Sequence, residues 1–98
     1  MNKTIVVIPS FNELKTLKML LPKLQEKNIN FVVIDDGSSD GTFNYLSKNY
    51  EKKSFIHHID NKGYENAIYS GYEYAKKNRY GYLATFDGDF QHDISDLI

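Results

Sequence analysis

The sequence predicts an open, mainly parallel α/β sheet with flanking helices, in the order β-α-β-α-β-α-β. Four short runs rich in Ile, Val, Phe and Tyr alternate along the chain with segments whose apolar residues recur at helical spacing. The connections between these segments are short, which indicates parallel strands joined by right-handed crossovers. This Rossmann-like arrangement is expected to form a single domain over residues 1–98.

Each expected strand is a compact apolar run. The four runs are Ile5–Ile8, Phe31–Ile34, Phe55–Ile59 and Tyr82–Phe86. The first two are apolar without alternation, as in strands that are covered on both faces of a parallel sheet.

The first expected helix carries a stripe of leucines between Leu14 and Leu24. Ser10–Glu13 has the spacing of a capping box, in which serine and glutamate side chains satisfy the first main-chain N–H groups of a helix. Pro22 lies inside the pattern and lacks an N–H, so a kink or an interruption is expected there.

Two further helices are expected, of which the second is the longer. The shorter one covers Thr42–Tyr50, and the longer one is expected to turn small and apolar residues towards the sheet. That inner face comprises Ala67, Ile68, Gly71, Tyr72 and Ala75. Its small residues would let the helix approach the sheet closely.

Composition narrows the classes of function. A net charge of −1 gives no reason to expect nucleic acid or an anionic membrane as a partner. The chain has no cysteine, which excludes disulfides and thiolate metal sites. No apolar run approaches the ~18 residues of a membrane span and no signal-peptide pattern is present, so a cytoplasmic location is the default expectation.

Aspartates gather in the loops that follow the predicted strands. In a parallel sheet these loops lie on one edge, where ligands bind. Seven of the eight aspartates fall there, namely Asp35, Asp36, Asp40, Asp60, Asp87, Asp89 and Asp93. Aspartate at a helix N-terminus is favoured by ~0.3–1 kcal/mol, which explains part of this asymmetry. It does not explain Asp87-Gly88-Asp89, because one cap needs one aspartate.

The pair Asp87 and Asp89 has the spacing of a divalent metal site. Residues i and i+2 of an extended segment point the same way, with α-carbons roughly 6.5 Å apart. Mg²⁺ typically takes one or two carboxylates and completes its shell with waters and phosphate oxygens. Gln91 could add a neutral oxygen. An acidic edge can therefore receive an anionic diphosphate if a metal ion lies between them.

The other loops suit a nucleotide. Asp35 and Asp36 follow a buried strand, where an acid can accept hydrogen bonds from base or ribose groups. Asn61–Gly63 opens the third helix, whose first amides can face phosphate or sugar oxygens. Lys62 is the only cation in these loops.

Four segments together resemble the first half of family 2 glycosyltransferases of the GT-A fold. They are VVIPSFNE (6–13), VVIDDGSSDGT (32–42), NKGYENAIYSGYEYA (61–75) and FDGDFQHD (86–93). The branch of dolichol-phosphate mannosyltransferases and bactoprenol glucosyltransferases is the most similar. The resemblance implies an inverting transferase that uses a nucleotide-diphosphate sugar and Mg²⁺ or Mn²⁺, with polyprenyl phosphate or a glycan as acceptor.

The resemblance also implies roles for particular residues. Asp87-Gly88-Asp89 matches the DxD motif that binds the metal and the donor diphosphate, and Gln91 matches a further metal ligand. The implied nucleoside and donor contacts are Pro9, Ser10, Asn12, Glu13, Asp35, Asp36, Lys62 and Gly63. Asp93 stands where many relatives carry proline. The family's acceptor half, with its general base, has no counterpart in residues 1–98, so no catalytic residue is assigned.

Several other interpretations follow from the same residues. A non-catalytic module that binds sugar nucleotides or assembles with a partner is the main alternative. FDGDFQ also resembles the opening motif of haloacid-dehalogenase-type phosphatases, although Gln91 stands where threonine is expected. A calcium loop at 36–41 lacks its closing glutamate. His57 and His58 are adjacent in a strand and face opposite sides, which argues against a zinc site.

Two expectations concern the surroundings of the chain. The fourth strand would be an exposed edge without the second half of the family domain, and exposed edges recruit other chains. Self-association through that edge is therefore expected. The resemblance also implies that the full-length protein works at the cytoplasmic face of the membrane.

Overall fold

The structure is a computed structural model that describes residues 3–86. A parallel sheet of four strands has the spatial order β3-β2-β1-β4, and its strands are β1 (Thr4–Ser10), β2 (Phe31–Asp36), β3 (Phe55–His58) and β4 (Tyr82–Thr85). All three strand pairs run parallel, which confirms the predicted α/β class and element order. Strands β2 and β3 extend the sheet on one side of β1. The chain then crosses back, and β4 pairs with the other side of β1.

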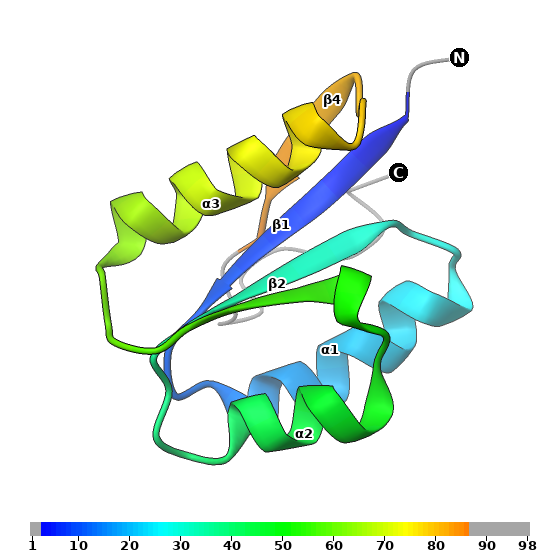
Figure 1. Ribbon diagram of the computed structural model, residues 1–98. Coiled ribbons are helices and arrows are strands. Elements are labelled where there is room, and N and C mark those ends of the chain that lie inside the picture. The colour runs from blue at the N-terminus through cyan, green and yellow to red at the C-terminus, as the bar shows by residue number, and fades with distance from the viewer. Residues whose placement is uncertain (1–2, 87–98) are drawn as a thin grey trace.

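Helices cover both faces of the sheet (Figure 1). Helices α1 (Leu14–Glu26) and α2 (Thr42–Asn49) lie on one face, and α3 (Tyr64–Lys77) lies on the other. A short 3₁₀ turn, η1 (Lys52–Ser54), leads into β3. Most of the leucine stripe of α1 is fully buried against Val6, Ile8 and Val33, whereas Leu14 at its start is half-buried. The fully buried members are Leu17, Leu20, Leu21 and Leu24.

The inner face of α3 is made of small residues, as predicted, but it is narrower than expected. Ala67, Gly71 and Ala75 are buried against the sheet, whereas Tyr72 is 53% exposed, so its assignment to this face is wrong. A Cβ atom on Gly71 would lie 2.3 Å from Cγ1 of Val7. The close approach of α3 to β1 therefore depends on the absence of a side chain at this position.

The predicted capping box at Ser10–Glu13 is wrong. Helix α1 begins at Leu14, and its N-cap residue Glu13 makes no side-chain capping hydrogen bond. The N–H of Leu14 instead donates to Oδ2 of Asp40, in the loop after β2, at 3.0 Å. Asn12 has a left-handed backbone with φ of 54°, which delays the start of the helix. Pro22 lies inside α1, and the helix is not interrupted there.

The strand boundaries also differ from the expected runs. Strand β1 continues through Pro9 and Ser10, and β2 continues through Asp35 and Asp36. In the sequence, Pro9 ends the first apolar run and Asp35 ends the second. In the structure, main-chain pairing of Ser10 with Asp35 extends the ladder between β1 and β2. The two acids therefore stand on a rigid strand end.

Candidate nucleotide-binding site

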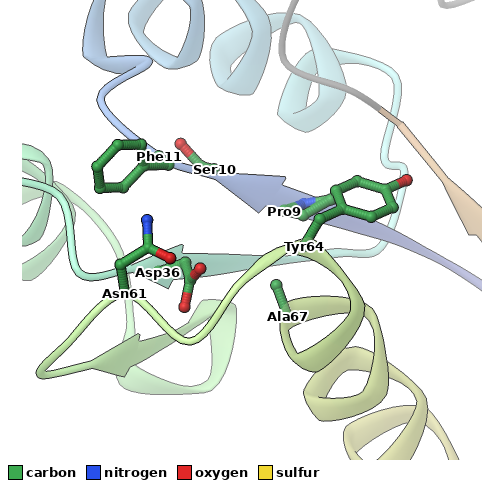
Figure 2. Close-up of a pocket in the computed structure, with 7 residues that line it drawn as sticks. All are labelled: Pro9, Ser10, Phe11, Asp36, Asn61, Tyr64 and Ala67. Atoms are coloured by element: carbon green, nitrogen blue, oxygen red, sulfur yellow. The ribbon is translucent and has the colours of Figure 1, made fainter.

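A small cavity of about 130 Å³ opens at the carboxyl ends of β1 and β2. Figure 2 shows the side chains around it, which come from β1 and the loop after it, the end of β2, the loop after β3 and the start of α3. They are Pro9, Ser10, Phe11, Asp36, Asn61, Tyr64 and Ala67. The cavity thus lies on the sheet edge where parallel α/β proteins bind ligands.

Asp36 is the charged group of the cavity and is only 4% exposed. Its Oδ1 accepts a hydrogen bond from the main-chain N–H of Lys62, and its Oδ2 accepts one from the N–H of Gly63, both at 2.9 Å. Burial opposes ionisation, but hydrogen bonds from His58, Lys62 and Gly63 outweigh it and lower the pKa of Asp36. Asp36 is therefore an anion at neutral pH that holds the turn before α3.

His58 supports Asp36 from the neighbouring strand. The parallel register pairs Asp36 with His58, and Nδ1 of His58 lies 2.8 Å from Oδ1 of Asp36. Because an ionised carboxylate only accepts, Nδ1 carries the proton and donates. Nε2 of His58 lies 2.9 Å from Oγ of Ser70 on α3. A chain of hydrogen bonds therefore joins α3, β3 and β2 beneath the cavity.

Asp35 points away from the cavity and organises the loop that follows β2. Its Oδ1 accepts from the N–H of Ser38 at 3.1 Å, and its Oδ2 lies 2.8 Å from Nδ1 of His57. The ring of His57 stacks on Phe43 of α2, with centroids 3.9 Å apart and planes 14° apart. The adjacent acids thus serve opposite sides of the sheet, as adjacent strand residues must.

Asn12 and Glu13 border the site without lining the cavity. The N–H of Asn12 donates to Oγ of Ser38 at 2.9 Å, and Oδ1 of Asn12 accepts from the N–H of Ser39 at 2.7 Å. Glu13 accepts a hydrogen bond from the hydroxyl of Thr16. The two contacts of Asn12 hold the loop after β1 against the loop after β2.

Of the residues predicted for donor binding, Pro9, Ser10 and Asp36 line the cavity, while Lys62 and Gly63 border it through their main-chain N–H groups. Oγ of Ser10 is buried, and no residue within 3–86 forms a hydrogen bond with it. Sequence reasoning placed Asn61 in a loop that suits a nucleotide, but it assigned no binding role to the side chains of Phe11, Asn61 or Tyr64. The position of Asn61 and Tyr64 at the mouth of the cavity depends on how the loop after β3 folds back towards β1, for which the sequence carries no local signal.

The predicted metal and diphosphate residues lie outside the described residues. Asp87, Gly88, Asp89 and Gln91 follow Phe86, whose N–H donates to the carbonyl of Val7 at 2.9 Å. The described chain therefore ends beside β1, one residue before Asp87. Within residues 3–86, no group of three or more His, Cys, Asp or Glu side chains could hold a metal ion.

Membrane-spanning segments are absent from the described part of the chain, where no helix is both long and apolar enough.

Comparison with protein-family models identifies the family of this chain. The profile described as "Glycosyl transferase family 2" matches residues 5–97. The chain belongs to glycosyltransferase family 2. This confirms the resemblance drawn from the four segments, and the alternating parallel sheet is consistent with part of a GT-A fold. Membership of this family also argues against the haloacid-dehalogenase-type phosphatase alternative.

Three curated proteins illustrate the similarity of individual sequences to this chain. The chain is 35% identical, over 95% of its length, to an uncharacterized protein of Methanocaldococcus jannaschii. It is 31% identical, over 94% of its length, to the UDP-N-acetylglucosamine–dolichyl-phosphate N-acetylglucosaminyltransferase of Methanococcus voltae. It is 34% identical, over 95% of its length, to the dolichyl-phosphate β-glucosyltransferase of Saccharomyces cerevisiae. The chain spans 43%, 43% and 32% of these three relatives.

Proposed function

We propose that this chain binds a nucleotide-diphosphate sugar with Mg²⁺ or Mn²⁺ and is the donor-binding part of an inverting glycosyltransferase. The observation that carries the proposal is the cavity beside Asp36, set on the ligand-binding edge of a family 2 glycosyltransferase sheet. Polyprenyl phosphate is the proposed acceptor, because two relatives are named for dolichyl-phosphate acceptors.

The described residues suit the nucleoside end of such a donor. Phe11 and Tyr64 are 47% and 57% exposed at the mouth of the cavity and offer aromatic surfaces against which a base can pack. Asp36 provides an acceptor for a base or ribose N–H or O–H group. The main-chain N–H groups of Lys62 and Gly63 are occupied by Asp36, so they do not bind phosphate.

The diphosphate end of the donor is proposed to bind the segment that begins after β4. Pairing of β4 with β1 brings the chain to Val7, two residues before the cavity residue Pro9, and Asp87 is the next residue in sequence. Asp87, Asp89 and Gln91 have oxygen donors of the kind that Mg²⁺ and Mn²⁺ prefer, and are proposed to hold the ion. When bound, the ion acts as a Lewis acid that stabilises charge on the departing diphosphate.

Calorimetric titration tests donor and metal binding together. UDP-glucose, UDP-N-acetylglucosamine and GDP-mannose are titrated with Mn²⁺ and again with EDTA. At least one sugar nucleotide should bind only with Mn²⁺, and Asp89→Ala should abolish this metal-dependent binding. Asp96→Ala, which removes the one aspartate outside the four loops, is the matched control and should bind as the wild type does. Equal affinity with and without EDTA contradicts the metal's role.

Sugar transfer separates an enzyme from a binding module. Transfer to a polyprenyl phosphate by this chain contradicts the non-catalytic alternative. Donor binding without transfer is expected of both, because the proposed chain supplies only the donor-binding part. Self-association through the β4 edge stays a prediction, and sedimentation at high concentration tests it.

A further inference from the structure

Strand β3 has an open outer edge. It lies at the end of the sheet, and among the described strands it pairs only with β2 (Figure 1). The N–H and C=O groups on the outer side of an edge strand can pair with a strand of another chain. Ile59, which follows β3 directly, is 85% exposed. This edge therefore offers both main-chain hydrogen-bonding groups and apolar surface.

A groove flanks this edge on each face of the sheet. Phe55 borders the groove on the α2 face and Ile56 borders the groove on the α3 face, because adjacent strand residues point to opposite faces. The groove on the α2 face measures about 340 Å³ and is lined by Phe43, Ser47, Tyr50, Lys52 and Phe55. The groove on the α3 face measures about 370 Å³ and is lined by Ile56, Tyr69, Ser70, Glu73, Tyr74 and Lys77. A strand added to a sheet edge places its alternate side chains in grooves of this kind.

The charges at the two ends of β3 indicate which chain fits this surface. Lys52 and Lys53 come directly before the strand, and Asp60 comes shortly after it. Lys53 forms an ion pair with Glu51 at 3.4 Å. Among residues 3–86, neither Lys52 nor Asp60 has an ion-pair partner. A strand that is basic before its start and acidic after its end is complementary to a second copy of itself in the antiparallel direction.

Antiparallel pairing centred on Ile56 matches the side chains as well as the charges. Ile56 then lies opposite its own copy on the α3 face, and Phe55 lies opposite His57 of the second copy on the α2 face. Side chains directly opposite in an antiparallel pair lie roughly 4.5–5.5 Å apart at Cβ, so apolar and aromatic pairs form. The same two-fold axis brings Lys52 towards Asp60 of the second copy, once at each end of the interface.

Other antiparallel registers lose this match. A shift by two residues keeps the same side chains on each face, but it sets Lys52 against Lys62 or against His58 instead of Asp60. A shift by one residue is excluded, because it would turn the faces of the two copies against one another. Parallel pairing would place the lysines of the two copies side by side.

We propose that β3 is the interface of a homodimer, in which two copies pair antiparallel through Phe55–His58 and join their sheets into one. One two-fold contact uses the β3 edge of both copies, so that edge is closed. The carboxyl ends of the strands point in opposite directions in the two copies, so the two cavities beside Asp36 open at opposite ends of the joined sheet. The inference does not depend on the proposed function. It also concerns the opposite end of the sheet from the predicted association through β4.

A single introduced cysteine tests the pairing directly. The chain has no cysteine, so Ile56→Cys carries the only thiol. Opposed residues of an antiparallel pair have α-carbons roughly 4.5–5.5 Å apart, which lies within the range that a disulfide spans. Mild oxidation should therefore convert this variant into a covalent dimer on a non-reducing gel. Met19→Cys, on the exposed side of α1, is the matched control and should stay uncrosslinked.

A charge swap tests the direction and register of pairing. Sedimentation of the wild type at increasing concentration should show a monomer–dimer equilibrium. Lys52→Asp should weaken association by about tenfold, because it sets like charges together at two symmetric positions. The double variant Lys52→Asp with Asp60→Lys should recover the wild-type affinity. Lys15→Asp makes the same charge change on the exposed surface of α1 and should leave association unchanged.

Each result supports or overturns the dimer. A monomer at every concentration overturns it. So does a dimer that Lys52→Asp leaves unchanged, which is the result expected if the β4 edge associates instead. Failure of the double variant to recover affinity, or failure of Ile56→Cys to crosslink, also overturns the pairing when circular dichroism shows a folded variant. If Ile56→Cys does not fold, the charge series decides alone.

Discussion

Replacing His58 with alanine is expected to lower the free energy of unfolding by about 2 kcal/mol. The change removes the 2.8 Å hydrogen bond to Oδ1 of Asp36 and the 2.9 Å contact with Ser70. Asp36, which is 4% exposed in the wild type, would keep only its two main-chain donors. A hydrogen bond to a charged group contributes about 1.5–3 kcal/mol, and losing it leaves a buried charge less well satisfied. In a domain of this size the melting temperature should fall by roughly 8–16 °C.

Urea denaturation followed by circular dichroism at pH 7 measures this cost, and two further variants locate it. In His58→Asn, the side-chain amide nitrogen can occupy the place of Nδ1, so part of the lost stability should return. Ser70→Ala keeps the bond between His58 and Asp36 and should cost less than about 1 kcal/mol.

The reasoning is refuted if His58→Ala stays within about 0.5 kcal/mol of the wild type, the range of ordinary surface substitutions. It is also refuted if Ser70→Ala costs as much as His58→Ala. The hydrogen bond from His58 to the carboxylate of Asp36, which Ser70→Ala keeps, would then not be the main source of the stability.

Three more predictions concern stability. Asp40→Ala removes the acceptor for the first N–H groups of α1 and α2 and should cost about 1 kcal/mol in urea denaturation; a change as small as that of an exposed surface variant would argue against its capping role. Gly71→Ala should cost about 1–3 kcal/mol, because the new methyl group would lie 2.3 Å from Cγ1 of Val7, and an unchanged melting temperature would contradict the packing. Since the folded-state pKa of Asp36 lies below 3.8, its stabilising contribution is present above that pH and is lost as the pH falls through the folded value. The difference in unfolding free energy between wild type and Asp36→Asn should therefore shrink in acid, and a difference that is constant from pH 7 to pH 2.5 would rule this out.

Sheet class and helix faces could be predicted because they depend on local patterns. Apolar runs and leucine spacing determine which residues can be buried, and the structure buries those of β1, β2 and α1. Helix starts were harder to predict. The residue that caps α1 is Asp40, which is 26 residues from Leu14 in sequence. The prediction had instead used the local Ser10–Glu13 pattern, in which both capping side chains are near the helix start.

The candidate site was predicted in part for the same reason. Pro9, Ser10 and Asp36 follow strands in sequence, so their place on the binding edge follows from parallel topology. Parallel topology alone did not predict that Asp36 lines the cavity while Asp35 holds the loop after β2. Which histidine meets which acid depends on the register of β2 against β3, across 22 residues of chain.

The sequence by itself determined the family, the order of strands and helices, and the edge of the sheet on which acidic residues gather. Only the tertiary structure decided that Asp36 is held by His58, Lys62 and Gly63, and that Asn61 shares the N–H of Gly63 with Asp36. The physical reason is that burial follows from the spacing of neighbouring side chains, whereas hydrogen bonds between distant segments require their backbones to be packed first.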